Sequence, residues 1–153
     1  MSDCVLGLDC GTKTGWAVLR DGQIIDSGVE VFEHLPDEAL GRAYRAWIQW
    51  ASETCAWFGV TILAYERPHY RGACTDWLVG LAAQAEVVAY EQGALPYRVH
   101  SATLKKFATG NGRADKAAMV EAARPFTDHA LGDDEADAIH VARWAAQTHT
   151  EGE

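Results

Sequence analysis

The sequence has few of the features that mark a secreted or membrane protein. Its four cysteines are widely scattered and form no C-x-x-C pair, which favours reduced thiols over a disulfide framework or a zinc site. No apolar stretch approaches the ~20 residues that cross a bilayer. The first residues also lack the basic and apolar pattern of a signal peptide. We therefore expect a cytoplasmic protein with no membrane contact.

Internal repeats, low-complexity tracts and long linkers are also missing from the 153 residues. A chain of this length falls in the usual range for one domain and buries roughly two-thirds of its unfolded surface without a disulfide or metal. We expect a single domain spanning residues 1–153, with only Thr148–Glu153 as a tail.

Basic residues are scarce, with 13 Lys and Arg against 22 Asp and Glu, for a formal net charge of −9. This balance is awkward for a nucleic-acid-binding protein, because phosphate neutralisation drives such binding. Distribution matters more than the total. One stretch carries a basic excess, from Arg98, Lys105, Lys106, Arg113, Lys116 and Arg124. It predicts either a localised phosphate-binding face or a solvated helix surface.

The hydrophobic pattern predicts a mixed sheet flanked by helices, which is an α/β fold. Short apolar runs predict five strands, at Cys4–Asp9, Gly15–Leu19, Gln23–Phe32, Val60–Tyr65 and Leu95–Val99. Helical spacing predicts five helices, at Pro36–Phe58, Asp76–Gln92, Ser101–Thr109, Asp115–Ala123 and Asp134–Gln147, with Ser101 as a candidate cap.

Acidic residues stand at the ends of the two most apolar strands. Asp9 closes the first run and Glu66 follows Val60–Tyr65. Each has an ordinary structural interpretation: Asp9 as a turn residue that accepts from backbone amides, and Glu66 as a partner of Arg67 or Arg71. If the two strands are parallel neighbours, the carboxylates meet at one sheet edge, and paired carboxylates repel unless a cation lies between them.

A third acidic element opens the last helix. Asp134 and Asp137 are three residues apart and share a helical face beside small alanines. Helix capping accounts for Asp133 and Glu135 but not for Asp137 on an otherwise apolar face. Oxygen ligands from two strand ends and one helix suit Mg²⁺ or Mn²⁺. Two such ions clamp a scissile phosphate in many nucleases.

Three motifs together resemble the RuvC-type Holliday-junction resolvases, in the same order and over nearly the whole chain. They are Leu6-Gly7-Leu8-Asp9-Cys10-Gly11-Thr12-Lys13-Thr14-Gly15-Trp16-Ala17, Tyr65-Glu66, and Asp134-x-x-Asp137-Ala138. The first is similar to compact phage-type members. The resemblance implies an RNase H-like fold in a bacterial cell or phage-infected host.

The same resemblance implies the roles of individual residues. Asp9, Glu66, Asp134 and Asp137 take the four acidic positions that hold two Mg²⁺ ions, which Mn²⁺ replaces. Lys116 is implied to be catalytic, by offsetting transition-state charge. The expected DNA contacts are Lys105, Lys106, Arg113, Lys116, Arg67, Arg71 and Tyr70, with Tyr70 as the aromatic residue that stacks at the crossover. His140, three residues after Asp137, is either near the metal site or structural.

The leading hypothesis is a homodimeric crossover junction endodeoxyribonuclease that cuts four-way or other branched DNA by two-metal hydrolysis. A two-fold substrate favours a two-fold enzyme. The helix Asp76–Gln92 is the candidate interface, and a buried core stripe is the competing interpretation of its apolar residues.

Two alternatives remain. A YqgF-type nuclease of the same fold, which acts on ribosomal RNA, shares the motif Asp9-Cys10-Gly11-Thr12-Lys13. A non-catalytic junction-binding protein is the other, although four clustered carboxylates without a metal would repel one another.

Overall fold

The computed structural model describes residues 2–35, 39–68 and 75–153. They form a five-stranded sheet with the order β3-β2-β1-β4-β5. The strands are β1 (Cys4–Asp9), β2 (Lys13–Arg20), β3 (Gln23–Val31), β4 (Ile62–Glu66) and β5 (Leu95–Val99). β1, β2 and β3 form an antiparallel meander, whereas β4 runs parallel to β1 and β5 parallel to β4. The predicted mixed α/β sheet is therefore confirmed.

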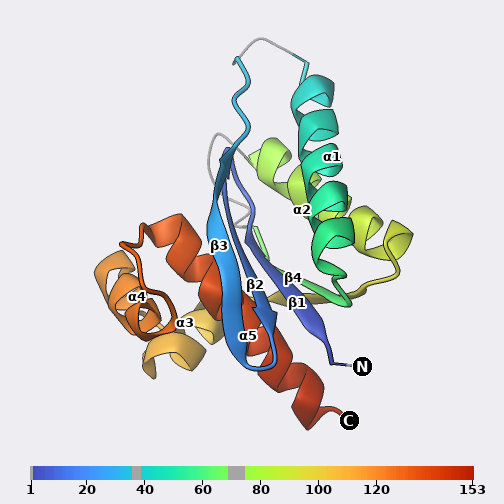
Figure 1. Cartoon of the computed structure of the whole chain (residues 1–153). Coiled ribbons are helices and arrows are strands. Elements are labelled where there is room, and N and C mark those ends of the chain that lie inside the picture. The colour runs from blue at the N-terminus through green and yellow to red at the C-terminus, as the bar shows by residue number, and fades with distance from the viewer. Residues whose placement is uncertain (1, 36–38, 69–74) are drawn as a thin grey trace.

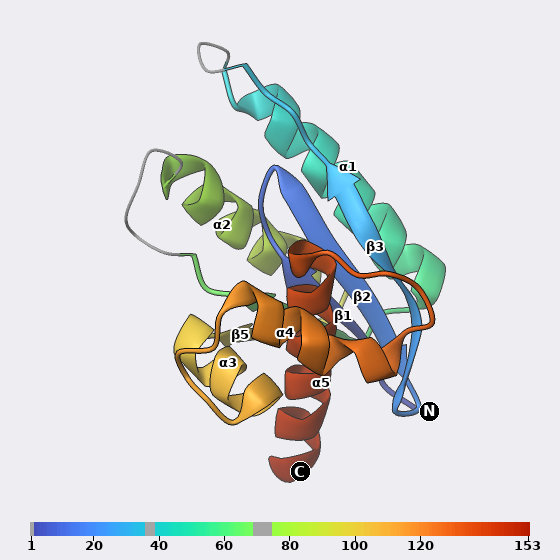
Figure 2. The same ribbon diagram turned by 90° about the vertical axis from the view of Figure 1, so that its left-hand side faces the viewer.

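Helices cover both faces of this sheet (Figure 1). α1 (Gly41–Phe58) and α2 (Thr75–Glu91) pack on one face. α3 (Ser101–Thr109), α4 (Lys116–Ala123) and α5 (Asp133–Glu151) lie on the other, with a 3-10 turn at Arg124–Phe126 before α5. Figure 2 shows α5 running along the sheet behind α3 and α4. None of the helices formed by the described residues is long and apolar enough to span a bilayer.

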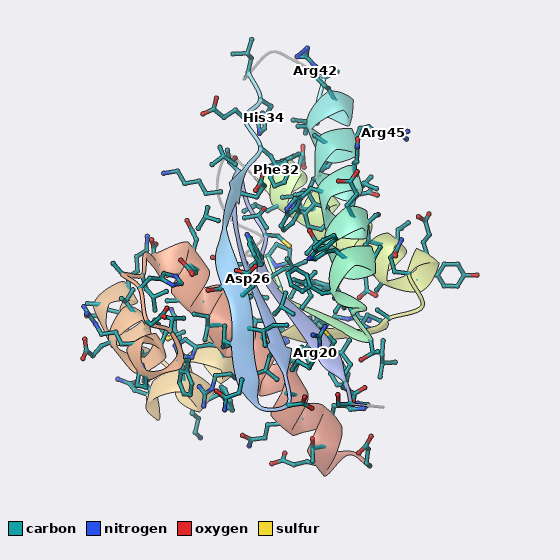
Figure 3. The ribbon with its side chains drawn as sticks, viewed as in Figure 1. Arg20, Asp26, Phe32, His34, Arg42 and Arg45 are labelled. Atoms are coloured by element: carbon teal, nitrogen blue, oxygen red, sulfur yellow. The ribbon has the colours of Figure 1, made fainter. Side chains whose placement is uncertain are left out.

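The α1/α2 layer is held by aromatic packing. Beyond β3 the chain runs toward the start of α1, carrying Phe32 and His34 (Figure 3). The Phe32 ring lies 5.5 Å from that of Trp50, and the His34 ring lies 4.8 Å from that of Trp77. Rings at these separations bury large areas and hold one geometry. These contacts therefore fix α1, α2 and the segment after β3 relative to one another on this face of the sheet.

The α5 layer is instead built on small residues. A Cβ added at Gly7 on β1 would lie 2.5 Å from the carbonyl oxygen of Ala138. One added at Gly15 on β2 would lie 1.9 Å from the carbonyl oxygen of Asp134. Both positions are possible only without a side chain, because such separations are far inside van der Waals contact. These glycines let the first half of α5 approach the ends of β1 and β2.

Most predicted boundaries hold to within two residues, and β1, β5 and α3 have the predicted limits. Three details were wrong. Ala39 and Leu40, predicted to be helical, precede the start of α1 at Gly41. Ser101 does not cap α3, because it is the first helical residue and His100 occupies the cap position. α5 continues to Glu151, so most of the expected tail is helical. The stretch 36–38, predicted to be helical, lies outside the described residues.

The apolar stripe of α2 belongs to the core of the chain. Trp77, Leu81, Ala85 and Val88 are all buried against the sheet and α1. The sequence left open whether these residues form a dimer interface or part of the core, and their burial within this chain is explained by the core. The large apolar side chains that α2 exposes are Val79, Val87 and Tyr90.

Candidate metal and nucleic-acid site

Three carboxylates from separate elements meet at the carboxyl ends of β1 and β4. The parallel register pairs Leu8 with Tyr65, so Asp9 and Glu66 end neighbouring strands. Asp137 reaches the same point from α5. Ligand oxygens of Asp9, Glu66 and Asp137 all lie within 4.8 Å of one another. The predicted convergence of the strand ends and the last helix is thus present.

These carboxylates repel one another. Burial raises the pKa of Asp9 well above its usual value, and the charges of Glu66, Asp137 and Asp134 raise it further. Burial, followed by repulsion from Glu66, raises the pKa of Asp137 to about 7. Such a group is costly to ionise unless a cation shares its charge. The oxygen-only donor set fits a hard divalent ion such as Mg²⁺ or Mn²⁺.

Asp134 completes the group. Its side chain is within hydrogen-bonding reach of Asp9. Burial raises the pKa of Asp134, while the hydrogen bond with Asp9 and the charges of Lys13 and Lys116 oppose that shift. Lys13 was not among the predicted site residues. Its position in the loop that follows Asp9, within the first motif of the resemblance, was the signal available in the sequence.

The loop that follows Asp9 is held by a buried hydrogen-bond network. The Thr14 hydroxyl donates to the Gly11 carbonyl oxygen at 2.7 Å. It accepts from the Trp47 indole N–H at 3.1 Å. Both Thr14 and Trp47 are fully buried. Buried polar groups with satisfied partners define one conformation, so the turn after Asp9 is anchored to α1 on the opposite face.

A cavity of about 380 Å³ opens beside the carboxylates. Glu66 and Asp137 line it, together with Lys105 on α3 and Lys116 at the start of α4. Two predicted lysines therefore face the space next to the acids. Lys116 forms an ion pair with Asp133, with Nζ 3.3 Å from Oδ2. Because both partners are well exposed, this pair is weak and would exchange readily for a phosphate.

The other predicted nucleic-acid contacts are more dispersed. Lys106 and Arg113 are exposed, and Arg67 lines a neighbouring cavity. Tyr70 and Arg71 lie outside the described residues. Arg98 pairs with Glu86 at 3.2 Å and Arg124 with Glu121 at 2.7 Å. The basic stretch is consequently divided, and only its central part faces the acids.

Two residues near the acids, His140 and Glu135, make structural hydrogen bonds. His140 is fully buried, and its Nε2–H donates to the Met119 carbonyl oxygen at 2.9 Å. Glu135 does not cap α5. It is buried and its Oε2 accepts from Ser27 Oγ at 2.6 Å and lies 2.5 Å from Nε2 of His129. The helix cap is Gly132, without a side-chain hydrogen bond, and Asp133, Asp134 and Glu135 lie in the first turn, where the helix dipole favours acidic residues.

Comparison with known proteins gives a match at the level of structure. No protein-family model matches the chain, and no curated protein matches it significantly in sequence. A structure of Thermus thermophilus RuvC superposes with a TM-score of 0.79 at 22% identity, covering 97% of this chain and 96% of that one. The T. thermophilus RuvC complex with a Holliday junction substrate gives 0.81 at 23%, covering 98% and 96%. The chain therefore has the RNase H-like α/β fold of RuvC.

Proposed function

We propose that the protein is a divalent-metal-dependent, structure-selective DNA endonuclease that cuts four-way junctions or related branched DNA. The supporting observation is the convergence of Asp9, Glu66 and Asp137 within 4.8 Å, with Asp134 beside them. Buried acids that repel in this way are explained by a cation, and a metal-assisted reaction on phosphate explains the adjacent lysines. A structural neighbour bound to a Holliday junction supports branched DNA as the substrate.

In this proposal the four carboxylates hold the cations and the lysines bind the substrate. Bound divalent ions would supply an activated water and stabilise the leaving 3′ oxygen. Lys105 and Lys116 line the cavity next to Glu66 and Asp137. They would hold the scissile phosphodiester by charge-assisted hydrogen bonds and offset charge that develops during cleavage.

The proposal also covers the subtype of resolvase, the extent of the domain and the oligomeric state. We place the chain with the compact phage-type resolvases, as one RNase H-like domain over residues 1–153. We also propose that it acts as a homodimer, since paired incisions on a two-fold junction need two sites. Sedimentation of the protein with and without a junction tests the dimer.

One cleavage assay tests the main proposal. Labelled four-way junction, fork, matched duplex and structured RNA are incubated separately in Mg²⁺ and Mn²⁺. We expect cuts in the junction and little or no cutting of the duplex. Preferred cleavage of the RNA would favour a ribosomal-RNA nuclease of the same fold, and tight junction binding without cuts would favour a binding protein.

Metal binding provides an independent test. Mg²⁺ or Mn²⁺ at 100 times its Kd should stabilise the folded protein by about 2.7 kcal/mol. The increase in Tm should be absent from Glu66→Gln. Equal increases in both proteins would contradict the metal assignment.

A further inference from the structure

A second cavity, of about 480 Å³, adjoins the one beside the carboxylates. The two share Ser101 and Lys105 in their linings. Arg67, His100 and Gly112 complete the polar and glycine lining of the second cavity. The first cavity contains Glu66, Asp115 and Asp137, whereas the described lining of the second includes no carboxylate. The first cavity therefore combines carboxylates with lysines, whereas the described charged lining of the second is basic only.

The start of α3 contributes backbone donors to this second cavity. His100 is the cap residue, in an extended conformation, and its side chain makes no capping hydrogen bond. The first helical backbone bond is from Leu104 N–H to the His100 carbonyl oxygen, at 2.9 Å. The amides of residues 101–103 precede that bond and have no acceptor within the helix. Such amides, together with the positive end of the helix dipole, favour an anion.

Arg67 provides a second and independent indication that the second cavity binds an anion. Its backbone N–H donates to the Val99 carbonyl oxygen at 2.8 Å, which ties the end of β4 to the end of β5. Its side-chain Nε is buried and has no hydrogen-bond partner within the described part of the chain. A buried donor of a charged group without an acceptor is costly. Because Arg67 also lines the second cavity, a turn of its guanidinium toward an anion held there would remove that cost.

We propose that this second cavity binds the backbone phosphate adjacent to the scissile one in the same DNA strand. This inference rests on the proposed nuclease function, because it takes the first cavity as the place of the scissile phosphate. Successive phosphates are joined by a single sugar, and the two cavities are joined through Ser101 and Lys105. The site reads no base, because its donors are a guanidinium, an ammonium, backbone amides and a hydroxyl. It sets the register of the strand over the metal site.

The experiment measures energetic coupling between Arg67 and a single phosphate. A synthetic four-way junction carries uncharged methylphosphonates, one at a time, at each phosphate around the crossover. Binding is measured by fluorescence anisotropy in Ca²⁺ at one salt concentration, because salt alone changes phosphate affinity. We expect one methylphosphonate to weaken wild-type binding on the order of tenfold, the loss typical of a charge-assisted hydrogen bond. Arg67→Gln should cause a similar loss and should no longer respond to that methylphosphonate.

Arg45→Gln is the charge-matched control. Arg45 is exposed on α1 and points away from the sheet (Figure 3). This variant should bind the unmodified junction as the wild type does and keep the response to the methylphosphonate. A similar loss in Arg45→Gln would show that net charge, not the cavity, sets the affinity, and would overturn the subsite.

A second pair of variants examines the backbone donors. Ser101 is the first helical residue, a position that tolerates proline, and the extended His100 suits a residue before proline. Ser101→Pro removes the amide donor and the hydroxyl, whereas Ser101→Ala removes the hydroxyl alone. Ser101→Pro should bind several-fold more weakly than Ser101→Ala, with unchanged helix content by circular dichroism. Equal affinities would exclude the amide, and if Ser101→Pro unfolds, the Arg67 coupling decides the proposal.

The outcomes separate this subsite from the nuclease proposal. If every methylphosphonate weakens wild type and Arg67→Gln by the same factor, the subsite is wrong even when the protein cuts junctions in Mg²⁺. If the coupling is found but no DNA is cut, the second cavity still binds a backbone phosphate, but the nuclease proposal fails and with it the position of that phosphate relative to a cut. If the junction is not bound at all, both are wrong.

Discussion

The two ends of α5 carry charged clusters that differ in how their charge is balanced. At the first end, Asp134 and Asp137 join Asp9 and Glu66 in a group made only of carboxylates. At the other end, His149 lies between two acids, with Nε2 3.4 Å from Asp3 Oδ2 and 3.2 Å from Glu153 Oε1. Both groups place three ligand atoms within 4.8 Å of one another.

Proximity alone therefore does not identify a metal site. The second cluster contains a ring nitrogen that faces both acids, and Nδ1 of the same ring is held 2.9 Å from the Tyr97 hydroxyl. Asp3 and Glu153 are also exposed, so water screens their charges. The first cluster is more buried and has lysines only at its rim. It is the one that a cation would stabilise.

Among the changes that compare the two clusters, Asp9→Asn in the first cluster should have the largest effect. We expect cleavage to fall by about 10³-fold, at the upper end of the loss for one electrostatic group in an active site. Without metal, the Tm should rise, because Asp9 no longer repels Glu66, Asp137 and Asp134. Junction binding should be retained. Gel assays and thermal denaturation in EDTA measure these effects, and Asp26→Asn, on exposed β3, is the matched control. A normal cutting rate in Asp9→Asn would refute the assignment.

Gly15→Ala tests the packing that brings Asp134 to the first cluster. The new methyl group would lie 1.9 Å from the Asp134 carbonyl oxygen, so the start of α5 must move away from β2. We expect a loss of about 3 kcal/mol in the free energy of unfolding, measured in urea, and a weaker Tm response to Mg²⁺. Gly41→Ala is the control, because nothing lies within 4 Å of its added Cβ. An unchanged metal response would show that α5 can be displaced without disturbing the site.

The pH dependence of stability should distinguish the clusters further. Asp137 has a pKa of about 7 in the folded protein, raised chiefly by burial, against about 3.9 when unfolded. Between these values the folded state binds more protons, so this carboxyl's contribution to stability is lost as the pH rises from about 4 to 7. In EDTA, Asp137→Asn should flatten that decline.

The comparison with wild type is needed because His140 changes stability with pH in the direction opposite to Asp137. Burial lowers the pKa of His140, so acid destabilises the folded protein below about pH 6.5. His140 is present in both proteins, so the difference between their stability curves reports the removal of Asp137, including the loss of its repulsion on Asp9. Parallel curves for wild type and Asp137→Asn would contradict the predicted slope.

His149→Ala should have the smallest effect. Removing an imidazole from two exposed acids should cost about 1 kcal/mol or less in the free energy of unfolding. Cleavage and the Tm increase in Mg²⁺ should both be unchanged. A loss of the metal response in this variant would mean that the C-terminal cluster, and not the one at Asp9, holds the cation.

The strands and helices were predictable because their signals are local. The apolar run Cys4–Asp9 and the period of α3 depend on neighbouring residues alone, and both were predicted with their observed limits. Two features depended on distant contacts that the sequence does not show. Glu135 lies in the first turn of α5 as expected, but Ser27 and His129 bind its side chain from other elements. Arg98 belongs to the basic stretch, whose role the sequence left open, and Glu86 of α2 pairs with it.

The sequence by itself determined the alternation of strands and helices, the acids that end the central strands, and the Asp134-x-x-Asp137 spacing on one helical face. Only the tertiary structure decided which charges lie next to one another. That property depends on the parallel register of β1 and β4, on the close approach of α5 over Gly7 and Gly15, and on which lysines the fold turns toward the acids. Charge balance is a sum over neighbours in space, and residues distant in the chain contribute most of it.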